Sequence, residues 1–246
     1  MNDTGTNREA ISENRKRIFA IDAEIMTNKA MIYSSRAIIE ENRSMILSNY
    51  SAAFMGNRQL ANQNTDEIFK NRHAILDNIN TRSITEENFI NAQKNKASLD
   101  FLKHRSDLNS EVLDISEEIA AINAKLIEIN KRIMASNQKI VDFNSEQIAI
   151  NSELLNNTID PEKATPDSNA IQIQRNRENM ANLEGQITRN QQKIEAVLKK
   201  SKTNTKALMK NKKDIHKRRE MIMTNRDALL KNRSKILIKS NLRPYF

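Results

Sequence analysis

The chain contains few of the residues that end helices and none of those that form covalent cross-links. Its 246 residues include three glycines, three prolines, no cysteine and no tryptophan. So few glycines and prolines leave few places for the chain to turn, which favours a small number of long helices. The absence of cysteine excludes disulfides and thiolate metal sites, and it suits the cytoplasm or another reducing internal compartment. Aromatic residues make up only 4% of the chain, which is typical of a coiled coil rather than a conventional globular core.

Signals for export and for chemistry are also missing. The opening segment MNDTGTNREA has no apolar stretch, and no apolar run approaches the ~18 residues of a membrane span. There is no glycine-rich phosphate loop or nucleophile motif. His73, His104 and His216 are isolated and lack metal-ligand spacing. We therefore expect a protein that is not an enzyme and has no metal, with no cofactor beyond chloride or water in its core.

Asparagine recurs every seven residues through most of the chain. An isoleucine or another apolar residue stands three positions before it, as in the pair Ile25 and Asn28 or the pair Ile39 and Asn42. Spacings of three and four place both residues on one helix face. We name the apolar position a and the asparagine position d of a heptad, with b, c, e, f and g following in chain order. One extra residue beside Gly56 interrupts the repeat, and a local bulge or overwinding could absorb it.

Two interruptions divide the repeat into three helical segments. Ser83 and Glu86 form a capping box that opens a new helix, and Pro161 with Pro166 marks a helix stop. The segments are helix one at 1–82, helix two at 83–157, a proline-containing loop at 158–168, basic helix three at 169–240 and a tail at 241–246. Folding back at each interruption gives an all-α, elongated antiparallel three-helix bundle with Ile at a and Asn at d. The rival architecture is a parallel oligomer of long helices.

The antiparallel fold aligns asparagines from all three helices. It predicts layers formed by Asn57/Asn109/Asn211, Asn71/Asn95/Asn225 and Asn78/Asn88/Asn232. Each buried amide without a hydrogen bond would cost about 1–3 kcal/mol, so these side chains must bond to one another, to water or to an ion. Two interpretations stay open. The layers either fix the register of the helices or bind an anion such as chloride.

The Ile-x-x-Asn heptad resembles the stalk repeat of trimeric autotransporter adhesins. The resemblance covers the periodic parts of all three helices, and it implies that asparagine at d could coordinate anions along the bundle axis. The adhesin stalks have Thr after the asparagine, whereas this chain mostly has Arg or Lys. They are also parallel trimers of secreted chains, so the resemblance does not imply adhesion here.

The net charge of +9 is concentrated in helix three. Residues 169–246 carry 20 basic and 6 acidic side chains, whereas residues 83–168 carry 9 basic and 15 acidic ones. A solvated face partly matched by helix two explains some of this excess. An anionic partner would explain the rest, and an acidic protein is favoured over nucleic acid or a membrane surface because 199–243 has no aromatic residue for base stacking. The candidate contacts are Lys199, Lys200, Lys206, Lys210, Lys212, Lys213, Arg218 and Arg219.

Helix two has a wider apolar face than one core-facing stripe requires. Isoleucine or phenylalanine occupies several of its c positions, including Ile122, Ile129 and Ile150. Either this helix lies deepest in the bundle, or position c is a seam for another molecule, which includes a second copy of the chain. The sequence thus predicts a structural spacer, scaffold or assembly protein that binds an acidic protein. The alternative is a nucleic-acid or anionic-membrane binding protein that uses the same basic helix.

Overall fold

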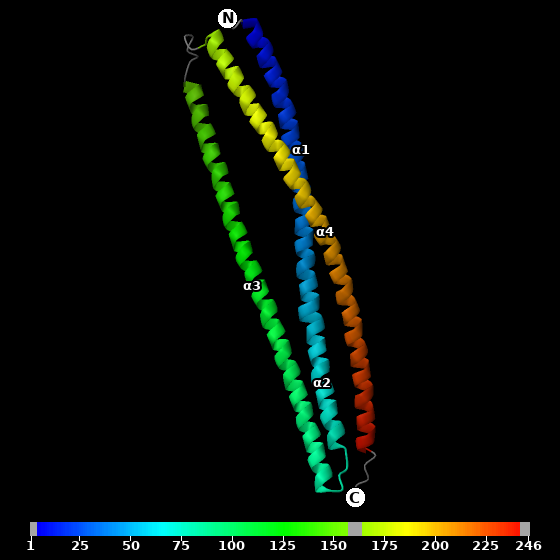
Figure 1. Cartoon of the computed structure of the whole chain (residues 1–246). Coiled ribbons are helices and arrows are strands. Elements are labelled where there is room, and N and C mark those ends of the chain that lie inside the picture. The colour runs from blue at the N-terminus through cyan, green and yellow to red at the C-terminus, as the bar shows by residue number, and fades with distance from the viewer. Residues whose placement is uncertain (1–3, 157–163, 242–246) are drawn as a thin grey trace. The chain divides into compact units, whose positions relative to one another are not determined.

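The computed structural model describes residues 4–156 and 164–241, and this part of the chain contains helices only. The elements are α1 (Thr4–Tyr50), the π-helix η1 (Ser51–Asn57), α2 (Arg58–Asp77), α3 (Ile84–Asn156) and α4 (Pro166–Asn241) (Figure 1). The predicted all-α helical bundle is therefore confirmed. The chain divides into two compact units. Of the described residues, unit 1 comprises 4–56 and 164–218, and unit 2 comprises 57–156 and 219–241.

Unit 1 is built from α1 and the first part of α4, which run in the same direction (Figure 1). Their contact buries position d of α1 and position a of α4. The buried residues of α4 here are Ile173, Met180, Ile187, Ile194 and Ser201. One apolar cluster joins Ile21 of α1 to Met180 and Ile187. The core of unit 1 is thus a single narrow seam between two helices.

The π-helix η1 absorbs the extra residue of the repeat. A π-helical turn holds one more residue than an α-helical turn, so it restores the heptad phase without ending the helix. Asparagines of α1 bond to residues 159 positions further along α4. Those of α2 bond to residues 158 positions further along. The sequence separation between bonded residues thus falls by one across η1. This confirms the bulge predicted beside Gly56, which lies within η1.

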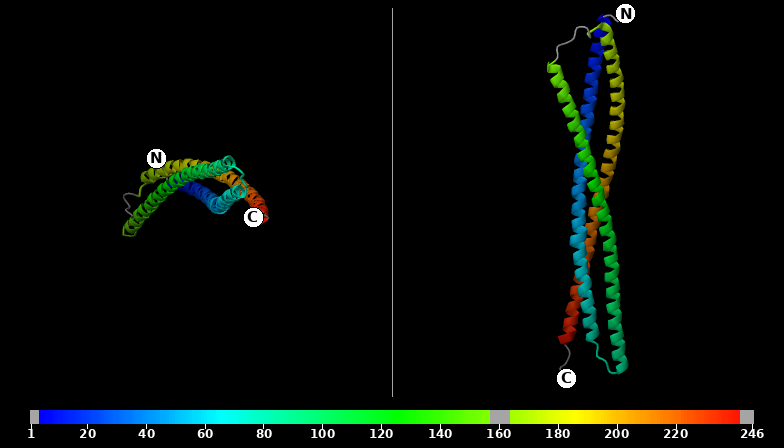
Figure 2. Two further views of the ribbon diagram at one scale, coloured as in Figure 1. Left: turned by 90° about the horizontal axis from the view of Figure 1, so that it is seen from below. Right: turned by 90° about the vertical axis from the view of Figure 1, so that its left-hand side faces the viewer.

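Unit 2 contains α2, α3 and the last part of α4. The right-hand view of Figure 2 shows α2 (cyan) beside both the start of α3 and the red end of α4. The α2–α3 hairpin is antiparallel and turns at residues 78–83. Ser83 caps α3 as predicted, because its Oγ accepts the backbone N–H of Glu86 at 3.2 Å. The Glu86 carboxylate accepts the N–H of Arg82 at 2.6 Å.

The start of α4 differs from the prediction by three residues. The helix begins at Pro166 rather than residue 169, because proline suits the first helical position, where no N–H is needed. Thr165 and Ser168 each accept the other's backbone N–H through a side-chain hydroxyl at 3.1 Å. Pro161 and most of the predicted tail at 241–246 lie outside the described residues.

Candidate functional site

Within each unit, asparagine side chains contact α4, those of α1 in unit 1 and those of α2 in unit 2, and we call both contacts the amide seam. In unit 1, Asn7, Asn14, Asn28, Asn42 and Asn49 donate from Nδ2 to the backbone carbonyls of α4 residues at position a, at 2.9–3.3 Å. In unit 2, Asn64 and Asn71 donate to the carbonyls of Ile222 and Leu229 at 2.9 and 3.3 Å. A short amide can reach a backbone carbonyl only when two helices approach closely. Each asparagine therefore fixes both the spacing and the register of its pair.

Two interruptions of the amide seam show what position d tolerates. Ile21 replaces asparagine and packs against Met180 and Ile187. Ser35 also replaces asparagine, and its buried hydroxyl has no hydrogen-bond partner among the described residues. Asn42 makes an additional contact, because its Oδ1 accepts the hydroxyl of Thr205 at 2.8 Å. Position d thus accepts an apolar side chain, although most of the seam uses an amide.

The predicted layers of three asparagines are not formed in unit 2. Asn71 and Asn78 use their amides on Leu229 and on the Ser240 hydroxyl, the latter at 2.8 Å. Their expected companions Asn95, Asn225, Asn88 and Asn232 are exposed. The prediction failed because it paired asparagine with asparagine, whereas α4 supplies the acceptors, a backbone carbonyl for Asn71 and the Ser240 hydroxyl for Asn78. In the remaining set Asn57 is buried, while Asn109 and Asn211 are exposed. Binding of chloride or water by these residues stays a prediction.

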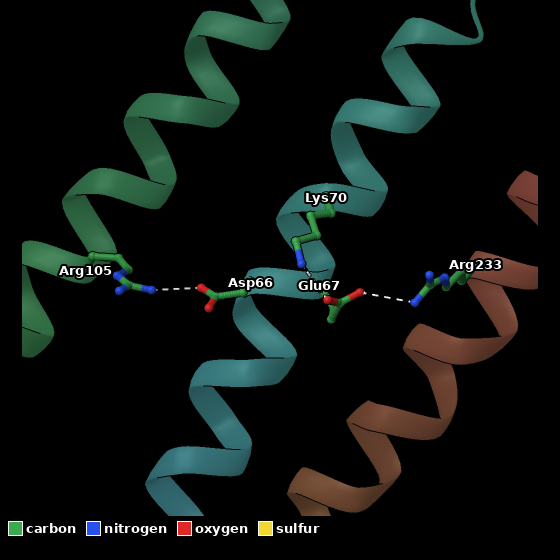
Figure 3. Close-up of polar contacts among 5 residues, drawn as sticks. All are labelled: Asp66, Glu67, Lys70, Arg105 and Arg233. Carbon is green, nitrogen blue, oxygen red and sulfur yellow. Dashed lines mark hydrogen bonds and ion pairs between the residues drawn. The ribbon is translucent and has the colours of Figure 1, made fainter.

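The contact between α2 and α3 is of a different kind, and we call it the charged seam. Arg105 of α3 donates to Asp66 at 2.8 Å, and Lys94 of α3 pairs with Asp77. On the other side of α2, Arg233 of α4 lies 3.4 Å from Glu67 (Figure 3). The neighbouring carboxylates of Asp66 and Glu67 therefore reach to opposite partners. The rings of Phe69 and Phe101 stack within the charged seam, with 4.4 Å between their centroids.

Hydrogen bonds from cations lower the pKa of three carboxyl groups. The Lys94 ammonium lowers the pKa of Asp77, and the Lys70 ammonium lowers that of Glu67. In unit 1, the Arg17 guanidinium donates to both oxygens of Glu184 at 2.5 and 2.6 Å. This fork lowers the pKa of Glu184. Asp77 is exposed, and Glu67 and Glu184 are half-buried, so solvent still screens these ion pairs and they orient the helices more than they stabilise them.

Helix α3 turns a different stripe toward its neighbour than the heptad predicts. The α2-facing side of α3 includes Ile90 and Ala97 at position f and Phe101 at position c. The a and d positions of the same segment, such as Leu99 and Asn95, are exposed. The prediction that Asn at d faces the core is therefore wrong for α3. The c-position residues Ile122, Ile129 and Ile150 continue the stripe that faces α2, and they are exposed.

The basic residues predicted to bind a partner lie together on α4. Lys199, Lys200, Lys206, Lys210, Lys212, Lys213, Arg218 and Arg219 are all exposed. Within the described parts of the chain, none of these eight forms an ion pair. They occupy several heptad positions but not position a, which faces α1 in this part of α4. We call residues 199–219 the basic stretch.

In unit 1, an apolar groove beside the basic stretch lies between α4 and the end of α1 with the start of η1. It is lined by Ile46, Tyr50, Ala53, Leu208 and Ile215, with Asn49, Asn211, Asp214 and Arg218 among its polar residues. The Tyr50 ring stacks on Phe54 with 5.4 Å between the centroids. Sequence reasoning missed this aromatic pair because it searched for aromatic residues only within helix three. The four-residue spacing of Tyr50 and Phe54 indicates the pair, and the 159-residue offset between α1 and α4 places Tyr50 beside the basic stretch.

Within the described residues, no group of three or more histidine, aspartate or glutamate side chains is arranged to hold a metal ion. None of the helices there combines the length and apolar character needed to cross a bilayer. Comparison of the chain with protein-family models, with curated proteins and with solved structures finds no match.

Proposed function

We propose that this protein is a non-enzymatic structural spacer or scaffold whose basic stretch binds an acidic protein partner. The observation that carries the proposal is that the ten lysines and arginines of residues 199–219 are all exposed and form no ion pair within the described chain. Such a charge excess on one helix attracts polyanions over a distance of about one Debye length, roughly 8–10 Å at physiological salt. Long coiled-coil pairing of the Ile–Asn heptads would supply the rigid spacer.

The groove beside Tyr50 supports a protein partner in particular. An acidic protein that inserts one apolar side chain between Ile46, Leu208 and Ile215 would combine apolar burial with ion pairs at the lysines. Apolar anchors surrounded by charge are typical of specific protein interfaces. The exposed c-position residues Ile122, Ile129 and Ile150 of α3 are a second candidate contact.

The alternative is binding of nucleic acid or an anionic membrane by the same lysines. The stacked Tyr50 and Phe54 rings favour nucleic acid more than the sequence alone suggests, because aromatic faces beside a basic groove can stack on bases. Salt dependence separates these partners. Binding through phosphate contacts alone weakens by orders of magnitude between ~50 and ~200 mM salt.

The test measures binding to duplex DNA, to anionic vesicles and to an acidic protein fraction across this salt range. We expect DNA and vesicle binding to collapse while one acidic protein persists. Changing Lys206, Lys210 and Lys213 to Gln should abolish that binding. The matched control, in which Lys231, Lys235 and Lys239 become Gln, removes the same charge elsewhere on α4 and should retain it. Sequence-selective DNA binding that survives at ~200 mM salt would establish the nucleic-acid alternative instead.

A further inference from the structure

Helix α3 carries an unused copy of the Ile–Asn repeat along its a and d positions. Leu99 is 67% exposed even though it lies in the part of α3 that packs against α2. Further along, Ile127 is 58% and Met134 63% exposed. At 100° per residue, the a/d stripe lies roughly 130° around the helix from the c-position stripe that faces α2. The a/d stripe is therefore left open even where α3 has a neighbour.

Few charged residues flank the a/d stripe of α3, so a second helix on this stripe would meet little electrostatic repulsion. Between residues 109 and 155 the flanking e and g positions hold only two charged residues, Glu117 and Lys131. The g positions are mostly apolar, including Ile119, Leu126, Ile133 and Ile140. All other acidic and basic residues of this segment occupy b and f on the far side. A strip about 70 Å long, with mostly apolar residues at a and g, asparagine at most d positions and only two charges at its edges, is a surface that pairs with another helix.

The amide seam shows what this repeat contacts. In unit 1, asparagine at d of one helix lies against an apolar residue at a of the other, as Asn14 does against Ile173 and Asn28 against Ile187. Helix α3 has both components on one face. In an antiparallel pair of identical helices, each a position lies opposite a d position of the partner. A two-fold axis would therefore match every asparagine with an apolar residue in a single closed interface.

We propose that the a/d stripe of α3 is a dimerisation surface that binds the same stripe of a second copy in antiparallel orientation. The two-fold axis lies near residue 132. Asn130 then lies against Met134 of the second copy, and Asn137 lies against Ile127 of the second copy. Asn123 meets Val141 of the second copy in the next layer. This arrangement covers the repeat from Leu113 to Asn151 on both chains, and it leaves the c-position stripe of α3 open.

The natural absence of cysteine makes single-cysteine cross-linking a direct test. A chain with one cysteine can cross-link only to another chain. The full-length Asn130→Cys variant should therefore give a covalent dimer with a short bis-maleimide at micromolar concentration. Arg132→Cys is the matched control, since it lies at the same height on the charged f position, and it should not cross-link. Asn109→Cys should not cross-link either, because an antiparallel pair separates the two copies of residue 109 by tens of ångströms.

Mass in solution gives the second measurement. Sedimentation should report a dimer for the natural chain and a monomer when Ile127, Met134 and Val141 become Gln. The control that changes Ile122, Ile129 and Ile150 to Gln should remain dimeric. Circular dichroism checks that both variants stay helical. A monomeric natural chain, equal cross-linking at residues 130 and 132, efficient cross-linking at residue 109, or a dimer broken only by the c-position variant would each overturn the proposal.

Discussion

In unit 2, helix α2 contacts two neighbours through different chemistry. It meets α4 through the amides of Asn64 and Asn71, which donate to backbone carbonyls. It meets α3 through the charged seam, where Asp66 and Asp77 pair with cations and Phe69 stacks on Phe101. The contact of α2 with α4 uses the same kind of hydrogen bond as the contact of α1 with α4 within unit 1. Helices that share the same Ile–Asn heptad repeat can therefore pack through different kinds of contact.

The two seams differ in how precisely the helices must be positioned for their polar groups to bond. An amide bonded to a carbonyl requires the helix backbones to be close and in one register, because neither group can move far. Long lysine and arginine side chains reach their carboxylates over several ångströms, so the charged seam tolerates small displacements. We infer that the amide seam determines how the helices align, while the charged seam adds orientation.

The strongest way to break the amide seam is to reverse one hydrogen-bonding group without changing its size. Asn28→Asp places a carboxylate against the carbonyl of Ile187 in a buried position. An unpaired buried charge should lower the free energy of unfolding by about 3–5 kcal/mol at neutral pH, measured by urea denaturation. Asn190→Asp in α4 is exposed and should cost less than about 0.5 kcal/mol.

The pH dependence of this variant distinguishes the cause of the loss. Burial next to a carbonyl should raise the pKa of the new carboxyl above its unfolded value, because the protonated form can donate to Ile187. Stability is then retained below the unfolded pKa and lost as pH rises through the folded pKa. Relative to the natural chain, the defect should shrink toward about pH 4. An equal loss at both positions and at all pH values would contradict the amide seam.

A smaller effect is expected from the apolar interruption of the same seam. Ile21 is 5% exposed within the cluster with Met180 and Ile187. Ile21→Ala should cost about 2 kcal/mol, at the low end for such changes, because a two-helix contact can partly collapse around the space. The control Ile18→Ala removes a side chain that is 50% exposed at position a, and it should cost less than about 1 kcal/mol. Similar losses in thermal denaturation would mean that d and a are equally buried.

The smallest expected effect separates the two contacts of α2 by their response to salt. Raising the salt concentration to ~1 M shortens the screening length to about 3 Å, which should weaken the ion pairs of the charged seam. Amide hydrogen exchange should therefore accelerate modestly in residues 84–112 of α3. Exchange in residues 219–241 of α4 should change less, because that contact uses the uncharged amides of Asn64 and Asn71 and only one ion pair, between Arg233 and Glu67. Equal acceleration in both segments would show that the seams share one electrostatic origin.

Local signals explain what the sequence predicted correctly. The sparse glycine and proline, the capping box of Ser83 and Glu86, and the extra residue near Gly56 act within one or two helical turns. They correctly indicated long helices, the start of α3 and the bulge η1. The partners of the asparagines could not be read in this way. A side-chain amide can bond equally well to another amide, to water or to a backbone carbonyl on a neighbouring helix.

For the described residues, the sequence by itself determined the helical structure, the turn at residues 78–83 and the concentration of charge in α4, because these follow from propensity, spacing and composition. Only the tertiary structure decided which face of each helix is buried. Asparagine at d is covered in α1 but exposed along α3. The a, d and c stripes of α3 are all partly apolar, so burial energy alone ranks them closely. Which face of a helix is buried therefore depends on polar atoms of the neighbouring helix. The carbonyls of α4 accept hydrogen bonds from asparagine amides at position d, and the aspartates of α2 form ion pairs with Lys94 and Arg105 of α3.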